Sequence, residues 1–162
     1  MIVRPAVSDD AVQAAYIYNH YIATSHATFE LDPIDGREML RRMESGSAAG
    51  YPFLICEADN GVCGYAYGSP HRGRSAYAHT VEVAVYVKPG KDGQGIGTRL
   101  YESLLGELER DGFHTAVAGI SLPNENSVGL HEKFGFKKVA HFREVGRKFD
   151  RWFDVGYWQK IL

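Results

Sequence analysis

The clearest hydrophobic pattern of this chain lies near its middle, in two adjoining segments with different periods. From residue 80 to 87 the side chains alternate between two sets, Val81, Val83, Val85 and Val87 on one side and Thr80, Glu82, Ala84 and Tyr86 on the other. This alternation has a period of two, and the segment is rich in β-branched residues. Both features predict a strand with two different faces. From residue 96 the period becomes helical, with an apolar stripe formed by Ile96, Leu100, Leu104 and Leu108. The stripe predicts an amphipathic helix of about four turns that ends near Gly112.

Shorter segments on both sides complete a mixed set of helices and strands. We expect strands over residues 2–4, 53–58, 62–68, 115–120, 137–145 and 151–162, and helices beginning near residue 9, over 35–46 and over 124–134. Ser8 and Asp35 are the expected N-caps of the first two helices. The resulting order, β-α-α-β-β-β-α-β-α-β-β, predicts an α+β fold with helices on a mostly antiparallel sheet. No repeat or long linker divides the chain, so residues 1–162 are predicted to form a single domain.

The composition is that of an ordinary globular protein with nearly balanced charge. Of the 162 residues, 44% are hydrophobic and 23% are charged, and the formal net charge is −2. We therefore expect no surface that binds nucleic acid or a membrane. The sequence has no apolar run near the roughly 18 residues of a membrane span, and its N-terminus lacks a basic-then-apolar signal pattern. A cytoplasmic protein is the expectation.

The two cysteines, Cys56 and Cys63, lie on either side of a hairpin signal, Asn60-Gly61. A two-residue turn at that signal would place Cys56 opposite Tyr65 and make the two cysteines diagonal neighbours. Diagonal neighbours are roughly 7–8 Å apart, beyond the usual reach of a disulfide, so we expect two reduced core cysteines. The seven histidines show no ligand spacing with either cysteine, and no metal site is predicted.

A glycine-rich turn, with glycines at 93, 95 and 97, joins the central strand to the central helix. The first turn of a helix has four backbone N–H groups without internal partners, and the helix dipole adds positive charge there. Glycines remove the Cβ atoms that would keep a phosphate away from these groups. A tight turn without a ligand explains the glycines equally well. Two common phosphate loops do not fit, because GxGxxG needs glycine where Thr98 stands and GxxxxGK[ST] is absent.

Two motifs in the second half of the chain resemble signatures of the GNAT superfamily of N-acetyltransferases. Residues 92–97, DGQGIG, resemble the acyl-CoA pyrophosphate loop [QR]-x-x-G-x-[GA], except that an acid replaces the first Gln or Arg. Residues 124–136 resemble the second signature, N-x-x-[AS]-x-x-L-[YH]-E-K-x-G-F. The resemblance runs nearly from end to end, and residues 80–87 and 146–159 resemble the phosphinothricin and methionine sulfone/sulfoximine N-acetyltransferases. It implies the acyl-CoA N-acyltransferase fold, a mixed, mostly antiparallel twisted sheet with flanking helices.

The resemblance implies acetyl-CoA as co-substrate and assigns residues to it. Three residues would pair with the pantetheine arm like an added strand: Val85, Tyr86 and Val87. Six residues would hold the pyrophosphate: Gly93, Gln94, Gly95, Ile96, Gly97 and Thr98. Asn124 would contact the pantetheine through its side chain, and Lys133 would reach the outer phosphates. An aspartate facing pyrophosphate would repel it, so we expect Asp92 to turn outward.

The chemistry of acetyl transfer assigns roles to two further side chains. Attack on a thioester needs a neutral amine, whereas an amino-acid ammonium is mostly protonated at pH 7. Glu82, the one acid in the apolar strand, is predicted to take this proton directly or through a water; the alternative is a structural carboxylate. The resemblance implies that a backbone N–H near Val85 donates to the developing oxyanion. His131 stands where many members have a tyrosine, and we predict that it protonates the departing thiolate; alternatively it is structural.

The resemblance also implies an acceptor site, formed by Phe29, Glu30, Arg72, Arg74, Ser75, Ala76 and Tyr77. The two arginines could clamp a carboxylate or phosphinate, or could belong to a solvated surface. We therefore predict transfer of the acetyl group to the amine of a small amino-acid analogue, by direct attack in a ternary complex. The alternatives are another acceptor (a polyamine, an aminoglycoside or a protein N-terminus) and a non-catalytic acyl-CoA-binding regulator. The aromatic tail, residues 147–162, predicts a homodimer.

Overall fold

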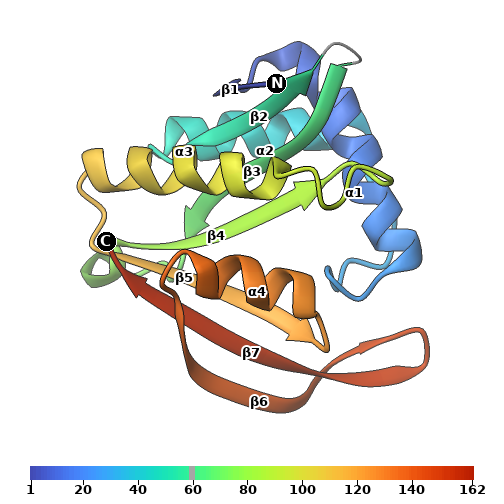
Figure 1. The fold of residues 1–162 in the computed structure, drawn as a ribbon, viewed down its shortest axis with the longest axis vertical. Helices are drawn as coiled ribbons and strands as arrows, with labels where there is room; N and C mark the ends of the chain where they lie inside the picture. Colours follow the sequence, from blue (N-terminus) through green and yellow to red (C-terminus); the bar gives the residue numbers. More distant parts are fainter. Residues whose placement is uncertain (59–60) are drawn as a thin grey trace.

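The computed structural model describes residues 1–58 and 61–162, and its helices and strands follow the predicted order (Figure 1). The strands are β1 (Ile2–Pro5), β2 (Phe53–Ala58), β3 (Gly61–Pro70), β4 (Thr80–Val87), β5 (Thr115–Leu122), β6 (Lys137–Lys148) and β7 (Arg151–Ile161). The α-helices are α1 (Ala11–Thr24), α2 (Gly36–Ala48), α3 (Ile96–Arg110) and α4 (Glu125–Lys133). The sheet order is β1-β2-β3-β4-β5-β7-β6, with β4 and β5 parallel and the other neighbours antiparallel. The predicted mixed, mostly antiparallel sheet with flanking helices is confirmed.

Helices cover both faces of the sheet, and each face has its own apolar core (Figure 1). On one face the predicted stripe of α3 is buried against the valine side of β4, chiefly Val81 and Val83. On the other face α1 and α2 pack against Ile55, Tyr65 and Tyr86. A fully buried leucine or valine contributes about 1.5–3 kcal/mol by leaving water. The apolar sides of the two elements predicted from the sequence, the valines of β4 and the stripe of α3, therefore meet in the same core.

The two central strands separate partway along their length. β4 and β5 pair only over Thr80–Glu82 and Thr115–Val117. Beyond these residues β4 continues along β3 and β5 continues along β7, and Figure 1 shows the two strands diverging. On the side of β4 that faces β5, the backbone of residues 83–87 therefore borders a cleft and not a neighbouring strand. Peptide groups at such an edge can pair with an extended ligand.

The start of α1 differs from the prediction. Ser8 makes no side-chain cap; it begins a 3₁₀ turn, Ser8–Asp10, and α1 starts at Ala11. The buried Asp10 carboxylate accepts hydrogen bonds from the Val7 N–H (2.8 Å) and from Arg4 (2.7 and 2.8 Å). The ion pair with Arg4 holds Asp10 in place, so Asp10 organises this turn in place of Ser8.

The β2–β3 hairpin also differs in register, by two residues next to the turn and by one residue at Cys56. Ala58 pairs with Gly61 and Cys56 pairs with Gly64, with an irregularity after Cys56, so Cys56 does not face Tyr65. The predicted turn included residue 60, which lies outside the described residues. Gly61, at φ +93°, begins β3 and is not the second turn residue. Both cysteines are free and buried, as expected.

The predicted start of α2 and the predicted end of α3 agree with the structure, whereas α2 ends at Ala48 and not at Gly46. Asp35 accepts a hydrogen bond from the Glu38 N–H (2.8 Å), so the predicted cap of α2 is confirmed. Gly112, at φ +84°, follows α3 in the left-handed conformation expected after a helix. Among the helices described, none combines the length and the apolar character needed to cross a membrane.

Candidate active site

A cleft of about 650 Å³ occupies the opening between β4 and β5. Its lining residues come from four segments, within residues 21–27, 83–87, 91–101 and 119–131. Nine of the predicted cofactor-binding residues line it: Val85, Tyr86, Val87, Gly93, Gly95, Ile96, Gly97, Thr98 and Asn124. The diverging strands therefore bring the glycine turn, the free edge of β4 and the start of α4 to one site.

The glycine turn forms a wall of this cleft with free backbone N–H groups. Gly93 (φ +74°) and Gly95 (φ +77°) adopt a conformation that L side chains rarely take. Gly95 is the N-cap of α3, and residues 96–98, whose N–H groups have no partner within the helix, line the cleft. A Cβ atom on Gly97 would lie 3.2 Å from Leu130 Cδ2, so the Leu130 side chain of α4 would have to shift to admit it. The turn fits a phosphate group.

Asp92, which departs from the family pattern, is exposed at the rim of the cleft. We expect Asp92→Arg to tighten acetyl-CoA binding by about 0.3–1 kcal/mol, the value of an exposed charge near a helix N-terminus. Calorimetric titration should therefore show a roughly two- to fivefold lower Kd. Glu102→Arg, at an exposed position further along α3, serves as the control. A hundredfold gain would mean that Asp92 faces the phosphates.

Two predicted cofactor contacts come from α4 and its N-cap. The Asn124 Oδ1 accepts a hydrogen bond from the Ser127 N–H (3.1 Å), which leaves its NH₂ group for a ligand. Lys133 Nζ donates to Thr98 Oγ1 (3.3 Å) and so joins α4 to the first turn of α3. Lys133 and Gln94 are exposed and lie outside the cleft lining. Their contact with the cofactor stays a prediction.

Glu82 is the last residue of β4 that pairs with β5, and it lies next to the cleft-lining Val83. Its Oε1 lies 2.8 Å from His71 Nδ1, and 39% of its side chain is exposed. A half-exposed carboxylate can exchange a proton with an amine or a water. His71 was not among the predicted site residues, although its place one residue after β3, in the loop that leads to β4, was a usable signal.

His131 is buried, and both of its ring nitrogens have partners. Nδ1 lies 2.7 Å from the Ser127 carbonyl oxygen, which can only accept, so Nδ1 carries a proton. Nε2 lies 2.7 Å from the Tyr101 hydroxyl and, in the neutral ring, accepts a hydrogen bond from it. Burial lowers the pKa of His131, while the hydrogen bond to Ser127 acts in the opposite direction. Tyr101 and His131 thus form one hydrogen-bonded pair in the cleft, and Tyr101 was not among the predicted site residues.

The lowered pKa of His131 predicts a loss of stability in acid. The unfolded chain protonates this residue with a pKa near 6.5, and the folded protein does so only at lower pH. The contribution of the buried, neutral His131 to the free energy of unfolding is therefore complete above about pH 6.5. It is lost as the pH falls toward the lower pKa that His131 has in the folded protein. We expect His131→Phe to show a smaller drop in Tm between about pH 7 and 5 than the wild type, by calorimetry. His114→Phe, at an exposed position, should keep the wild-type drop, and an equal drop in both variants would contradict the assignment.

The predicted acceptor residues Phe29 and Glu30 lie in the α1–α2 loop and are already engaged. The Phe29 ring lies 6.3 Å from that of Phe153. Arg42 binds both carboxylate oxygens of Glu30, at 2.6 and 3.1 Å. Burial opposes ionisation of Glu30, but the hydrogen bonds from Arg42 and Tyr18 outweigh it and lower its pKa. Glu30 therefore has a partner within the protein.

The other predicted acceptor residues share the exposed β3–β4 loop: Arg72, Arg74, Ser75, Ala76 and Tyr77. None of them lines the cleft between β4 and β5. The Tyr77 ring lies 5.7 Å from the His71 ring, which contacts Glu82. The loop is therefore connected to Glu82 through His71, and its contact with an acceptor stays a prediction.

A histidine and a serine also meet in the cleft, where they join the α1–α2 loop to β5. His26 Nδ1 lies 2.9 Å from Ser121 Oγ, and the Ser121 hydroxyl donates to the carbonyl oxygen of His26. The hydroxyl proton therefore goes to the backbone and not to the imidazole, so this is not the arrangement of an activated nucleophile. Within residues 1–58 and 61–162, no cluster of three His, Cys, Asp or Glu side chains could hold a metal ion.

Comparison with known proteins agrees with this geometry. Residues 4–156 match the family described as acetyltransferase (GNAT) domain. The chain is 42% identical to the phosphinothricin N-acetyltransferase of Streptomyces coelicolor, over 99% of this chain and 95% of the relative. It is 36% identical to the L-methionine sulfoximine/L-methionine sulfone acetyltransferase of Salmonella typhimurium, over 100% and 95%. A GNAT superfamily phosphinothricin acetyltransferase from Sinorhizobium meliloti, solved with acetyl-CoA, matches with a TM-score of 0.96 and 33% identity, over 99% of this chain and 88% of that one.

Proposed function

The chain belongs to the GNAT acetyltransferase family and uses acetyl-CoA as its acyl donor, and we propose that it acetylates the amine of a small amino-acid analogue, of the phosphinothricin or methionine sulfoximine and sulfone type. The observation that supports this most is the position of Glu82. This half-exposed carboxylate lies where β4 leaves β5, between the cleft for acetyl-CoA and the loop that contains Arg72 and Arg74. The cytoplasmic location expected from the sequence is part of the proposal.

Direct transfer in a ternary complex fits the side chains of the cleft. An acyl-enzyme route would need an activated nucleophile within it. Cys56 and Cys63 are buried in the core, and neither is among the cleft-lining residues. The Ser121 hydroxyl donates to a backbone carbonyl instead of to His26. These contacts favour attack by the acceptor amine itself.

The proposed roles belong to residues that line or adjoin the cleft. Acetyl-CoA, when bound, supplies the thioester, and the β4 backbone at Val85–Val87 would hold its pantetheine arm. Glu82, oriented by His71, accepts the ammonium proton. The N–H near Val85 donates to the carbonyl oxygen as it gains charge. The Tyr101–His131 pair serves the leaving sulfur: the hydroxyl proton that Tyr101 donates to His131 Nε2 in the resting protein passes to the sulfur as the C–S bond breaks, and the proton released by the amine returns through solvent to restore the hydroxyl.

The exposed Arg72 and Arg74 are proposed to bind the acidic end of the acceptor. A charged hydrogen bond of this kind is worth about 1.5–3 kcal/mol. Substitution of either by Gln should therefore raise the acceptor KM by roughly tenfold or more and leave the acetyl-CoA KM unchanged. Equal effects on both substrates would make the arginines structural.

A panel of amines tests the proposed function. The protein is incubated with acetyl-CoA and a thiol reagent, and thiol release is measured with phosphinothricin, methionine sulfoximine, spermidine, an aminoglycoside and a short peptide. We expect release with the amino-acid analogues. Release only with the other amines would reject the acceptor class. Binding of acetyl-CoA without release for any amine would point to a non-catalytic acyl-CoA-binding protein.

We further propose that the chain forms a homodimer through the β6–β7 hairpin, which Figure 1 shows at one edge of the sheet. Its exposed apolar side chains are Val139, Phe142, Val145, Phe149, Trp152 and Ile161. Light scattering at micromolar concentration should give a dimer mass for the wild type. Trp152→Glu should shift it toward monomer, because a central aromatic contributes at least about 2 kcal/mol to an interface. Tyr16→Glu, at an exposed aromatic of α1, is the control, and a monomeric wild type would reject the proposal.

A further inference from the structure

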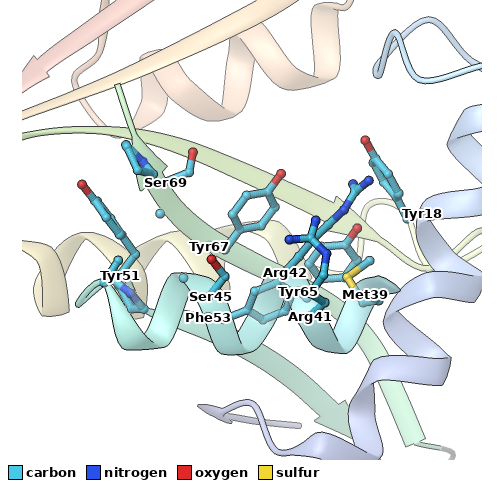
Figure 2. Close-up of a pocket in the computed structure, with 15 residues that line it drawn as sticks. Tyr18, Met39, Arg41, Arg42, Ser45, Tyr51, Phe53, Tyr65, Tyr67 and Ser69 are labelled. Atoms are coloured by element: carbon cyan, nitrogen blue, oxygen red, sulfur yellow. The ribbon is translucent and has the colours of Figure 1, made fainter. Parts of the chain in front are cut away.

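A second cavity, of about 360 Å³, lies between α2 and the face of the sheet opposite α3. Figure 2 shows it with Tyr67 near its centre and the side of α2 that holds Ser45 and Arg42 along one wall. None of its lining residues belongs to the cleft between β4 and β5. It is therefore a separate space from the one assigned to acetyl-CoA.

The floor of this cavity is aromatic. Phe53 stacks on Tyr65 and on Tyr67, with ring centroids 5.3 and 5.4 Å apart and the planes nearly parallel. Met39 of α2 and Tyr18 of α1 close one end. Flat rings and a flexible thioether side chain favour an apolar or aromatic guest.

The charges at this cavity are paired within the protein. Arg42 binds Glu30 at 2.6 Å and Glu38 at 2.7 Å. Arg41 binds Glu38, also at 2.7 Å. Burial raises the pKa of Tyr67 to about 12, so its hydroxyl keeps its proton at neutral pH. An anionic guest would have to displace an existing carboxylate, whereas an uncharged guest would not.

The cavity ends beside the proposed base. β3 and β4 are antiparallel neighbours in which Ser69 lies opposite Glu82 and Tyr67 lies opposite Ala84. Residues directly opposite on paired strands have Cβ atoms about 4.5–5.5 Å apart and share one face of the sheet. Ser69 and Tyr67 line the cavity, while Ala84 lines the acetyl-CoA cleft. An acceptor whose amine lies at Glu82 therefore has the cavity within reach of its side chain.

From this geometry we propose that the aromatic cavity under α2 receives the side chain of the acceptor and selects amino acids with a large uncharged side chain, aromatic or thioether-like. The inference rests on the proposed function and narrows it. Neutral analogues such as methionine sulfone fit the cavity better than phosphinothricin, whose side chain is anionic. Among plain amino acids, phenylalanine and methionine should exceed alanine in kcat/KM by tenfold or more, since each methylene in an apolar pocket is worth about tenfold or more.

Filling the cavity tests the proposal. Ser45 faces the cavity and is exposed, and Ser47 is exposed on the same helix but does not line it. Ser45→Phe should lower kcat/KM for L-phenylalanine and L-methionine at least tenfold, change that for L-alanine less than threefold, and leave the acetyl-CoA KM unchanged. Ser47→Phe, the matched control, should behave as the wild type. An equal fall for all three amino acids, or no fall in Ser45→Phe, would overturn the assignment of the cavity.

A binding measurement separates this inference from the proposed function. Calorimetric titration of L-phenylalanine into the protein, with and without acetyl-CoA, needs no turnover. If no amino acid is acetylated by the wild type, the proposed function fails. Binding of L-phenylalanine that is lost in Ser45→Phe and kept in Ser47→Phe would still support an apolar amino-acid site. Binding that is absent from the wild type, or equal in both variants, would overturn the site itself.

Discussion

Glu82→Gln should lower kcat by about 10²–10⁴-fold and leave the affinity for acetyl-CoA nearly unchanged. Glutamine keeps the shape of the side chain and can still hydrogen-bond to His71, which lies 2.8 Å from Glu82 in the wild type. It cannot accept a proton, and general-base catalysis is typically worth this range. Because the change acts on the chemical step, single-turnover rates should fall with kcat while the Kd for acetyl-CoA stays constant.

The dependence on pH adds a second readout for Glu82. Raising the pH should partly restore the rate of Glu82→Gln, because more of the acceptor amine then arrives without its proton. Glu109→Gln, at an exposed position on α3, should keep wild-type turnover. If Glu82→Gln turns over at nearly the wild-type rate at pH 7, Glu82 is a structural carboxylate and the base lies elsewhere.

Lys148→Met should destabilise the fold by about 2–4 kcal/mol. Lys148 is buried in β6, and its ammonium donates to the carbonyl oxygens of Ser25 (2.7 Å), Thr28 (2.9 Å) and Tyr21 (3.4 Å). Methionine keeps the apolar stem but removes all three hydrogen bonds to a charged donor, each of which is worth about 1.5–3 kcal/mol. Burial lowers the pKa of Lys148, so the cost of desolvating the ammonium offsets part of this gain.

Urea unfolding and calorimetry measure the effect of Lys148→Met. For a chain of this size the loss corresponds to a Tm lower by roughly 4–16 °C, at about 2–4 °C per kcal/mol. Lys137→Met changes an exposed lysine of the same strand and should be within about 0.5 kcal/mol of the wild type. The acceptor KM should rise in Lys148→Met and not in Lys137→Met, because Lys148 holds the α1–α2 loop, which contains Phe29 and Glu30. If Lys148→Met has the same Tm as Lys137→Met, the three hydrogen bonds of Lys148 do not stabilise the fold.

Much of the fold could be predicted from the sequence because the signals were local. The alternation over residues 80–87 and the stripe of α3 each reflect contact with one face of the sheet, which a period of two or of 3.6 records directly. The cap at Asp35 acts within three residues, so it too was visible. The predicted Ser8 cap was wrong because Asp10 is held by Arg4, in β1, and the hairpin register was wrong because Gly61 begins β3 instead of completing the turn.

By itself the sequence determined the order of the elements, the glycine turn with its free N–H groups and the acid in β4, since all depend on residue type and short spacing. Only the tertiary structure decided that β4 and β5 separate after Glu82, which creates the cleft, and that His71 lies against Glu82. It alone paired Tyr101 with His131 and placed the ammonium of Lys148 among three carbonyls, one at the end of α1 and two in the α1–α2 loop. These contacts join residues 11 to 127 positions apart in the sequence. No local period records them, because they arise only when the sheet and its helices have packed together.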